Sequence, residues 1–353
     1  MGITSLDRIK IALAHEEPDR VPLAMFASEY LARLCGYEVR EFCMDPEKIL
    51  RANRVFMERY GNDCAWVWTD TWFMQEGWGL NMRWYSDRAP SPTGPLIKNP
   101  EEYYELEVLD PFEDGRMPVI LKALELASRE LGDRGIITGA FGPIELISHL
   151  RGWTASMRDL IMHPEAVHEA CRTLMKTVIE FYRAAKECGA NCVFLQVARN
   201  DATMLSEKQV KDFGIRYEKP ILNELKRMGI PVILHLCNTE PMIELLLKEY
   251  PENSWQGLQW GSRISNLPLA KAKRDFGDGI ALVAGLDNIF TLPSKAPGEV
   301  EEQARESIEI AAPGGGFILS TDCEISPDTP DENLLAVRRA VEKYGNYPIR
   351  TRY

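Results

Sequence analysis

The stretch Ser206–Cys237 reads SEKQVKDFGIRYEKPILNELKRMGIPVILHLC and contains a helix pattern followed directly by a strand pattern. It opens with Ser-Glu-Lys-Gln, which is typical of a capped helix start, and Gly229 is the residue expected just past a helix end. The sequence therefore predicts a helix over Ser206–Met228. The apolar run Pro231–Cys237 does not alternate with polar residues, as expected of a parallel strand that is buried on both faces.

The same kind of apolar run recurs along the chain, and helical patterns separate the runs. Eight strands that alternate with helices predict an α/β fold of the (β/α)₈ TIM-barrel type. An open doubly wound sheet is the alternative, but it would need a Gly-rich phosphate turn after its first strand, and Gly314–Gly316 precedes a strand instead. The predicted strands are Val21–Met25, Asp63–Trp68, Gly135–Phe141, Asn191–Val197, Pro231–Cys237, Trp255–Trp260, Ile280–Leu286 and Gly316–Asp322. Further helices are predicted over Pro46–Tyr60, Pro164–Cys188, Pro297–Ala311 and Pro330–Tyr344.

The spacing of the runs is uneven between the second and third strands. The segment Trp84–Pro100, WYSDRAPSPTGPLIKNP, carries four prolines, which indicates a hairpin and a loop before a helix that begins near Met117. We therefore predict one domain over residues 1–353 with a lid-like insertion at residues 69–116, on the side where barrel enzymes bind their substrates.

Charge and hydropathy exclude several classes of protein. The 353 residues include 41 Lys and Arg against 53 Asp and Glu, a net charge of −12, which argues against binding to nucleic acid or to anionic membranes. The sequence has no apolar run near the roughly 18 residues of a membrane helix, and its start lacks the apolar core of a secretory signal. Eight cysteines in a chain of this length are too few for a disulfide scaffold, so we expect a reducing cytoplasm.

A candidate metal site falls at the ends of two predicted strands. His235 and Cys237 are two residues apart on one strand, so their side chains point to the same face. Cys323 ends the eighth strand, across the mouth of a closed barrel from the fifth. One His and two Cys are good zinc ligands that leave a fourth position open. A buried His and core cysteines are the alternative interpretation of the same pattern.

Motifs along nearly the whole chain resemble the uroporphyrinogen decarboxylase superfamily. The last of them, with its D-T-P-x-E-N tail, is the most specific. The matching stretches are EEPDRVPL (Glu16–Leu23), TGAFGPIELI (Thr138–Ile147), the segment Met162–Asn191, PVILHLCNT (Pro231–Thr239), ALVAGLDN (Ala281–Asn288) and GGGFILSTDCEISPDTPDENL (Gly314–Leu334).

Two features favour the zinc-dependent corrinoid methyltransferase branch of that superfamily over its metal-free decarboxylases. The decarboxylases carry an arginine-rich loop after the first strand, where this chain reads LAMFASEYLARLCG (Leu23–Gly36). They also have a histidine where this chain has Cys323. The resemblance assigns His235, Cys237 and Cys323 as the zinc ligands of a methyltransferase.

The resemblance implies that the methyl group moves between a small substrate and cobalt. The substrate would be a thiol acceptor, a methoxylated aromatic or another methyl donor, and the aromatic residues slightly favour O-demethylation. The sequence lacks the corrinoid-binding D-x-H-x-x-G motif, so cobalamin is expected on a partner corrinoid protein. The alternatives are a porphyrinogen-type decarboxylase and a non-catalytic barrel with a closed structural zinc site.

Other candidate residues fall at predicted strand ends and in the insertion. Asp70 and Asp287 are candidate catalytic acids, and capping or turn formation explains them equally well. Gln196 and Asn200, with Asp201, are candidates for substrate binding, as are Trp72 and Trp78. Packing in the core and in the lid is the alternative interpretation of the dense aromatic set (Trp66, Trp68, Trp72, Phe73, Trp78, Trp84 and Tyr85). Glu324 is a candidate acid beside Cys323.

Overall fold

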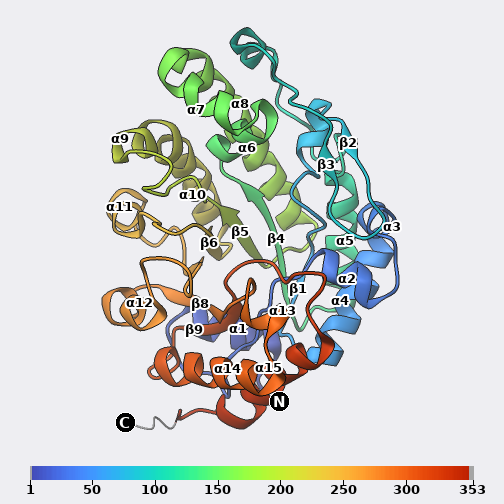
Figure 1. Cartoon of the computed structure of the whole chain (residues 1–353), viewed down its shortest axis with the longest axis vertical. Helices are drawn as coiled ribbons and strands as arrows, with labels where there is room; N and C mark the ends of the chain where they lie inside the picture. Colours follow the sequence, from blue (N-terminus) through green and yellow to red (C-terminus); the bar gives the residue numbers. More distant parts are fainter. Residues whose placement is uncertain (1, 350–353) are drawn as a thin grey trace.

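The computed structural model describes residues 2–349, and its centre is a curled sheet of seven parallel strands. Helices surround the strands on the outside (Figure 1). The strand order is β1-β4-β5-β6-β7-β8-β9. The strands are β1 Cys64–Trp66, β4 Gly135–Phe141, β5 Cys192–Gln196, β6 Val232–Leu236, β7 Gly257–Trp260, β8 Ala281–Leu286 and β9 Phe317–Thr321. This arrangement confirms the predicted α/β barrel class.

The first predicted strand, Val21–Met25, is not a regular strand, and this corrects the expected count of eight. It lies between β9 and β1, where it makes one parallel bridge, Leu23 to Leu319. Side chains take the place of a strand neighbour on its other side. The N–H of Leu23 donates to Asp63 Oδ2 at 2.8 Å, and the N–H of Met25 donates to Asn62 Oδ1 at 2.8 Å. The barrel is thus closed by an irregular segment in which the amides of Leu23 and Met25 donate to side chains, while the amide of Ala24 donates to the carbonyl of Leu319 on β9.

The helices follow the sequence patterns closely, with one exception. The expected helix Ser206–Met228 is divided into α9 Glu207–Gln209, a π-helical segment Val210–Ile215 and α10 Arg216–Met228. The other helices are α1 Ser5–Leu13, α2 Glu29–Leu34, α3 Val39–Met44, α4 Pro46–Tyr60, α5 Met117–Glu130, α6 Pro143–Arg151, α7 Trp153–Met162, α8 Pro164–Glu187, α11 Ile243–Glu249, α12 Leu269–Phe276, α13 Thr291–Ser294, α14 Pro297–Ala311 and α15 Asp331–Tyr344.

The segment between β1 and α5 has the predicted hairpin, formed by β2 Met82–Arg83 and β3 Ser91–Pro92. A 3₁₀ helix, η1, covers Gln75–Trp78, and a second, η2, covers Pro100–Glu105. The N–H groups of Leu96 and Ile97 both donate to the carbonyl of Leu150 at the end of α6. The insertion is therefore tied to the outer helices of the barrel.

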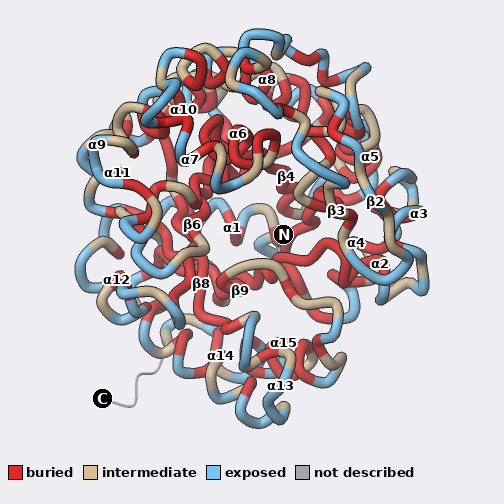
Figure 2. The backbone as a smooth tube through the Cα atoms, turned by 45° about the horizontal axis from the view of Figure 1, so that its top comes forward, coloured by how far each residue is buried: buried red, intermediate tan, exposed pale blue. Residues whose placement is uncertain are grey.

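Burial follows this layering. The seven strands of the central sheet are buried throughout, and most outer helices combine a buried inner face with an exposed outer face (Figure 2). Helix α1 packs across the amino-terminal ends of the strands, where Ile9 lies against Gly135 and Leu13 lies against Gly257. Beside these apolar contacts, a buried ion pair joins Arg8 of α1 to Asp63, just before β1. The predicted metal ligands lie at the opposite, carboxyl ends of the strands. No helix within residues 2–349 is long and apolar enough to cross a membrane.

Candidate functional site

His235 is held inside the barrel near the carboxyl end of β6. It is fully buried, and its ring lies 4.9 Å from the ring of Phe194 on β5. The strand register aligns it with Gln196 on β5 and with Gln259 on β7. Because residues in register on parallel strands face the same side of a sheet, these three side chains form one polar row. Cys237 follows β6 directly, two residues beyond His235.

Cys323 is positioned by the residues on either side of it. The buried Asp322 carboxylate accepts hydrogen bonds from Ser262 Oγ at 2.7 Å and from the N–H groups of Arg263 and Gly285. The carbonyl of Glu324 accepts a hydrogen bond from Asn288 Nδ2 at 2.9 Å. The loop after β9 is thereby fixed to the ends of β7 and β8, and Cys323 faces β6.

The structure brings His235, Cys237 and Cys323 together, as the sequence predicts. One ligand atom from each lies within 4.8 Å of the others. Cys323 Sγ is 3.6 Å from His235 Nε2. In a tetrahedral zinc site, ligand bonds of about 2.0 Å to N and 2.3 Å to S separate these two atoms by about 3.5 Å. The donor set and its spacing therefore fit a zinc ion.

The two thiols differ in acidity because they share a proton. A hydrogen bond from Cys323 and the nearby His235 hold the pKa of Cys237 well below its usual range, although burial opposes this. The pKa of Cys323 is raised by its contact with Cys237 and by burial. The guanidinium of Arg199 also lowers the pKa of Cys237. The site therefore favours one thiolate before any cation binds, which suits a metal ligand.

Two buried polar atoms beside the ligands are unpartnered within the described chain. They are His235 Nδ1 and Gln259 Oε1, which belong to residues in register on β6 and β7. Gln259 Nε2 donates to Ser320 Oγ and to the Thr321 carbonyl, both at 2.9 Å, which ties it to β9. His235 thus has its Nε2 directed to Cys323 and its Nδ1 free to carry the ring proton.

Asp70 is buried at the start of the insertion and is engaged in an ion pair. Both of its oxygens contact the Arg116 guanidinium, at 2.5 and 2.9 Å. Its Oδ1 also accepts the N–H of Trp72 at 2.7 Å. Arg116 in turn stacks 4.9 Å from the ring of Trp84. These contacts anchor the insertion, and a catalytic role for Asp70 stays a prediction.

Asp287 and Asn200 are also held by structural contacts. Asp287 accepts hydrogen bonds from the N–H groups of the next turn, those of Ile289, Phe290 and Thr291. Asn200 is fully buried, and its Nδ2 donates to Glu218 and to Tyr250. Its side chain therefore faces α10. The neighbouring candidate Asp201 is bonded to its own loop through Thr203 and to the loop after β6 through the N–H of Glu240.

The two tryptophans proposed for substrate binding lie in different surroundings. The half-buried ring of Trp72 is 5.0 Å from the ring of His149 on α6. Trp78 donates from Nε1 to the carbonyl of Glu107 at 2.9 Å, within the insertion itself. Gln196 has the best placement of the binding candidates, since it is in register with His235. Glu324 contacts Ser28 and the N–H of Glu29, on the far side of Cys323 from β6.

Sequence reasoning missed Glu145 and Arg199. Glu145 lies on the first turn of α6, immediately after β4, and it is 5% exposed. Arg199 follows β5, and its Nη2 is 3.2 Å from Glu145 Oε1. The spacing of Glu145 and His149, four residues apart on a helix that begins at a strand end, was the available signal.

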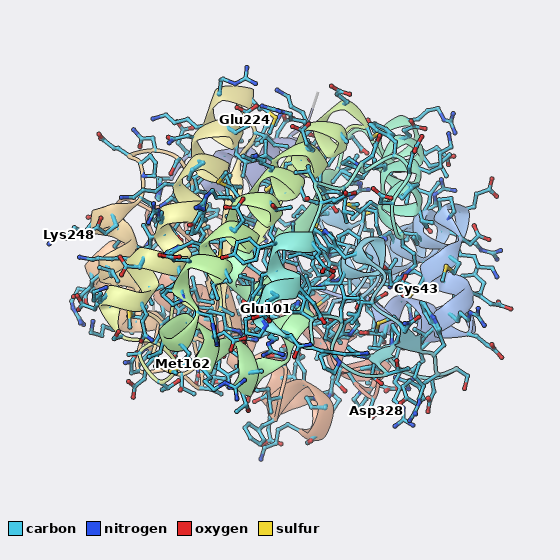
Figure 3. The ribbon with its side chains drawn as sticks, turned by 90° about the horizontal axis from the view of Figure 1, so that it is seen from above. Cys43, Glu101, Met162, Glu224, Lys248 and Asp328 are labelled. Carbon is cyan, nitrogen blue, oxygen red and sulfur yellow. The ribbon has the colours of Figure 1, made fainter. Side chains whose placement is uncertain are left out.

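A surface hollow of ≈ 400 Å³ lies between η2 and the end of α7, and its lining includes Glu101, Tyr104 and Met162. Figure 3 labels Glu101 and Met162. None of the three candidate metal ligands lines it. The candidate site is therefore defined by its chemistry and by its place at the strand ends.

The fold and the site together define a barrel protein with a His-Cys-Cys group at the carboxyl ends of its strands that could hold a metal ion. Residues 4–344 match the protein family described as Uroporphyrinogen decarboxylase (URO-D). The chain belongs to this family, as its sequence motifs predict.

Relatives from both the methyltransferase and the decarboxylase branches of the family match the chain. The chain is 25% identical to the methylated-thiol--coenzyme M methyltransferase of Methanosarcina mazei, over 92% of this chain and 84% of that protein. It is 27% identical to a uroporphyrinogen decarboxylase of Carboxydothermus hydrogenoformans, over 87% and 86% of the two chains. A solved methyltransferase from Methanosarcina mazei has the same fold, with a TM-score of 0.84, 23% identity and coverage of 97% and 99%.

Proposed function

We propose that this protein is a zinc-dependent methyltransferase, which moves a methyl group between a small substrate and the cobalt of a corrinoid protein. The observation that carries the proposal is the convergence of His235, Cys237 and Cys323, whose ligand atoms lie within 4.8 Å of one another. Relatives named as methyltransferases support it, among them a methylcobamide:CoM methyltransferase of Methanosarcina barkeri, 26% identical over 73% of each chain.

The side chains around the site have definable tasks in this reaction. Zinc would supply Lewis-acid activation of a thiol or an oxygen in the substrate. His235, Cys237 and Cys323 would hold the ion and leave one position open. Asp322 keeps the Cys323 loop in place through its three hydrogen bonds. Gln196, in register with His235, is the side chain best placed to orient a substrate by hydrogen bonding.

A decarboxylase is the second candidate, because relatives of that name match the chain equally well. A porphyrinogen carries many carboxylates, which arginines would bind. The segment Leu23–Gly36 after the first predicted strand contains a single arginine, Arg33. Its guanidinium is directed to the carbonyls of Pro327 and Thr329. This loop therefore offers little to a polyanionic substrate.

Zinc content is the first test. The purified full chain is expected to hold about one zinc per molecule, and Cys323→Ala is expected to lose most of it because a thiolate ligand is removed. Cys35→Ala is the matched control, since Cys35 is a half-buried free thiol on a different part of the chain. Equal zinc content in all three proteins, or none in the wild type, would refute the proposed site.

Methyl transfer is the second test. Zinc-loaded protein is incubated with methylcobalamin and a small thiol, and in a separate assay with cob(I)alamin and a methoxyarene. A change in the cobalamin absorption spectrum that needs Cys323 would support the proposal and would give the direction of transfer. Decarboxylation of a porphyrinogen by the metal-free protein would support the second candidate instead.

A further inference from the structure

A charged cluster beside the metal ligands has no role in the function proposed so far. Its centre is Glu145, on the first turn of α6. Oε1 of Glu145 is 3.2 Å from Arg199 Nη2 and 3.9 Å from His149 Nε2. Oε2 is buried and has no hydrogen-bond partner within residues 2–349. A buried carboxylate oxygen without a partner is costly, and such an atom calls for an explanation.

Glu145 lies within the electrostatic reach of the metal ligands. Cys237 raises the pKa of Glu145, and His235 lowers it. Burial is the largest influence, and together with these neighbours it raises the pKa of Glu145 to about 7, while Arg199 acts in the opposite direction. A carboxyl group with such a pKa both accepts and donates a proton near neutral pH.

The charged and titratable groups that face Glu145 come from the neighbouring elements and from its own helix. Arg199 and Ala198 follow β5, and the backbone N–H of Ala198 donates to Glu145, which lowers its pKa. His235 and Cys237 belong to the end of β6, and the buried Glu218 on α10 also interacts with Glu145. On its own helix, burial and Arg199 lower the pKa of His149 to about 3, so this imidazole is neutral.

Two of these neighbours show which oxygen of Glu145 is engaged. Gln75 Nε2 lies 2.7 Å from His149 Nδ1, and an amide nitrogen only donates, so the ring proton of His149 is on Nε2, toward Glu145. The guanidinium of Arg199 lies 4.3 Å from the ring of Trp153. Oε1 of Glu145 is thus occupied by its neighbours, and Oε2 is the oxygen left for a ligand.

We propose that Glu145 is the proton carrier of this site. When a thiol or hydroxyl arrives at His235, Cys237 and Cys323 as methyl acceptor, Glu145 takes its proton and passes it to water after the methylated product has left. In the opposite direction, when a methylated donor loses its methyl group, Glu145 gives a proton to the sulfur or oxygen left behind. In the forward step the S–H or O–H bond breaks, its electron pair stays on the substrate atom, and the proton adds to Oε2. The proposal rests on the function proposed above.

Glu145 is better suited to this task than the acids that the sequence suggested. Asp70 has both oxygens on Arg116, and Asp287 is bonded to the backbone of its own turn. Each of these carboxylates would have to give up stabilising contacts before it could accept a proton. Glu145 has an oxygen available without any rearrangement.

The test counts the protons that thiol binding releases to the buffer. Zinc-loaded full-length protein is titrated with 2-mercaptoethanol at pH 8 in a calorimeter, in phosphate and in Tris, which differ in ionisation enthalpy. The wild type should release almost no protons, since Glu145 is largely ionised at pH 8 and takes up the thiol proton. Glu145→Gln should release about one proton per bound thiol, because the thiol is bound as thiolate and the proton has no acceptor in the protein.

Two further variants complete the experiment. Glu145→Asp, which keeps a carboxylate, is expected to bring the count back toward that of the wild type, and Glu240→Gln, at an exposed glutamate, is expected to match the wild type. Equal proton release from wild type and Glu145→Gln would overturn the proposal. Loss of zinc from Glu145→Gln would also overturn it, since Glu145 would then be a metal ligand. A wild-type protein without zinc would refute the proposed function itself.

Discussion

The buried Glu218 gives a quantitative prediction about stability. Its Oε2 accepts hydrogen bonds from Asn200 Nδ2, at 2.9 Å, and from the hydroxyl of Tyr250. Glu218 Oε1 and Asn200 Oδ1 are both buried and have no partner within the described chain, and both lie near Gly214 in the π-helical segment. Burial raises the pKa of Glu218 to about 7 from 4.5. Ionisation of Glu218 should therefore destabilise the fold, and Glu218→Gln should remove this effect.

The pKa difference sets the size of the effect. About 2.5 pKa units at about 1.36 kcal/mol each give about 3 kcal/mol. The folded pKa is the higher one, so this stability is fully present below about pH 4.5 and is lost as the pH rises through about 7. Compared with the wild type, Glu218→Gln should be little changed at pH 5 and more stable by up to about 3 kcal/mol at pH 8.

Urea unfolding at the two pH values measures the prediction. Glu145 titrates in the same range, but it is intact in both proteins, so its own contribution largely cancels in the comparison. Glu240→Gln, at an exposed position, is the control and should change stability equally at pH 5 and pH 8. If the free-energy difference between Glu218→Gln and wild type were the same at both pH values, the reasoning about the buried carboxyl would be wrong.

Three other substitutions test how the barrel is held together. Asp63→Asn removes the buried carboxylate that pairs with Arg8 and with the half-buried Arg20, while Arg8 keeps its contacts with Asp19, and urea unfolding at pH 7 should show a loss of about 3 kcal/mol. Arg116→Met leaves Asp70 buried and unpaired, so we expect a similar loss and faster proteolysis of the insertion; unchanged proteolysis would count against its anchoring role. Gly139→Ala would place a Cβ 2.5 Å from the carbonyl oxygen of Phe194, which should lower stability by about 1–3 kcal/mol; an unchanged urea midpoint would contradict this packing argument.

Most of the fold could be predicted because parallel strands and their helices carry local signals. The first strand could not, since Val21–Met25 has a strand-like sequence whose outcome depends on distant residues. The amide of Leu23 is taken by Asp63 and the amide of Met25 by Asn62, both across the closing seam of the barrel. A residue pattern within the segment contains no information about those acceptors.

The break in the helix Ser206–Met228 has a similar cause. The π-helical segment includes Gly214, where an added Cβ would lie 2.5 Å from Asn200 Oδ1. The helix is therefore fitted around a buried amide from the β5 loop and around Glu218 on its own next turn. Local sequence patterns marked both ends of the helix, whereas the contact between Gly214 and Asn200 determined the form of its interior.

The metal ligands were predictable because strand periodicity and strand ends are visible in the sequence. The roles of the acids were not, because a carboxylate is defined by the donors that reach it. Asp70, Asp287 and Glu145 all follow strand ends at the mouth of the barrel. The structure gives the first two a full set of partners and leaves Glu145 Oε2 with none. Since a saturated carboxylate must lose contacts to act and an unsaturated one gains them, the difference in partners makes Glu145 the stronger candidate for chemistry.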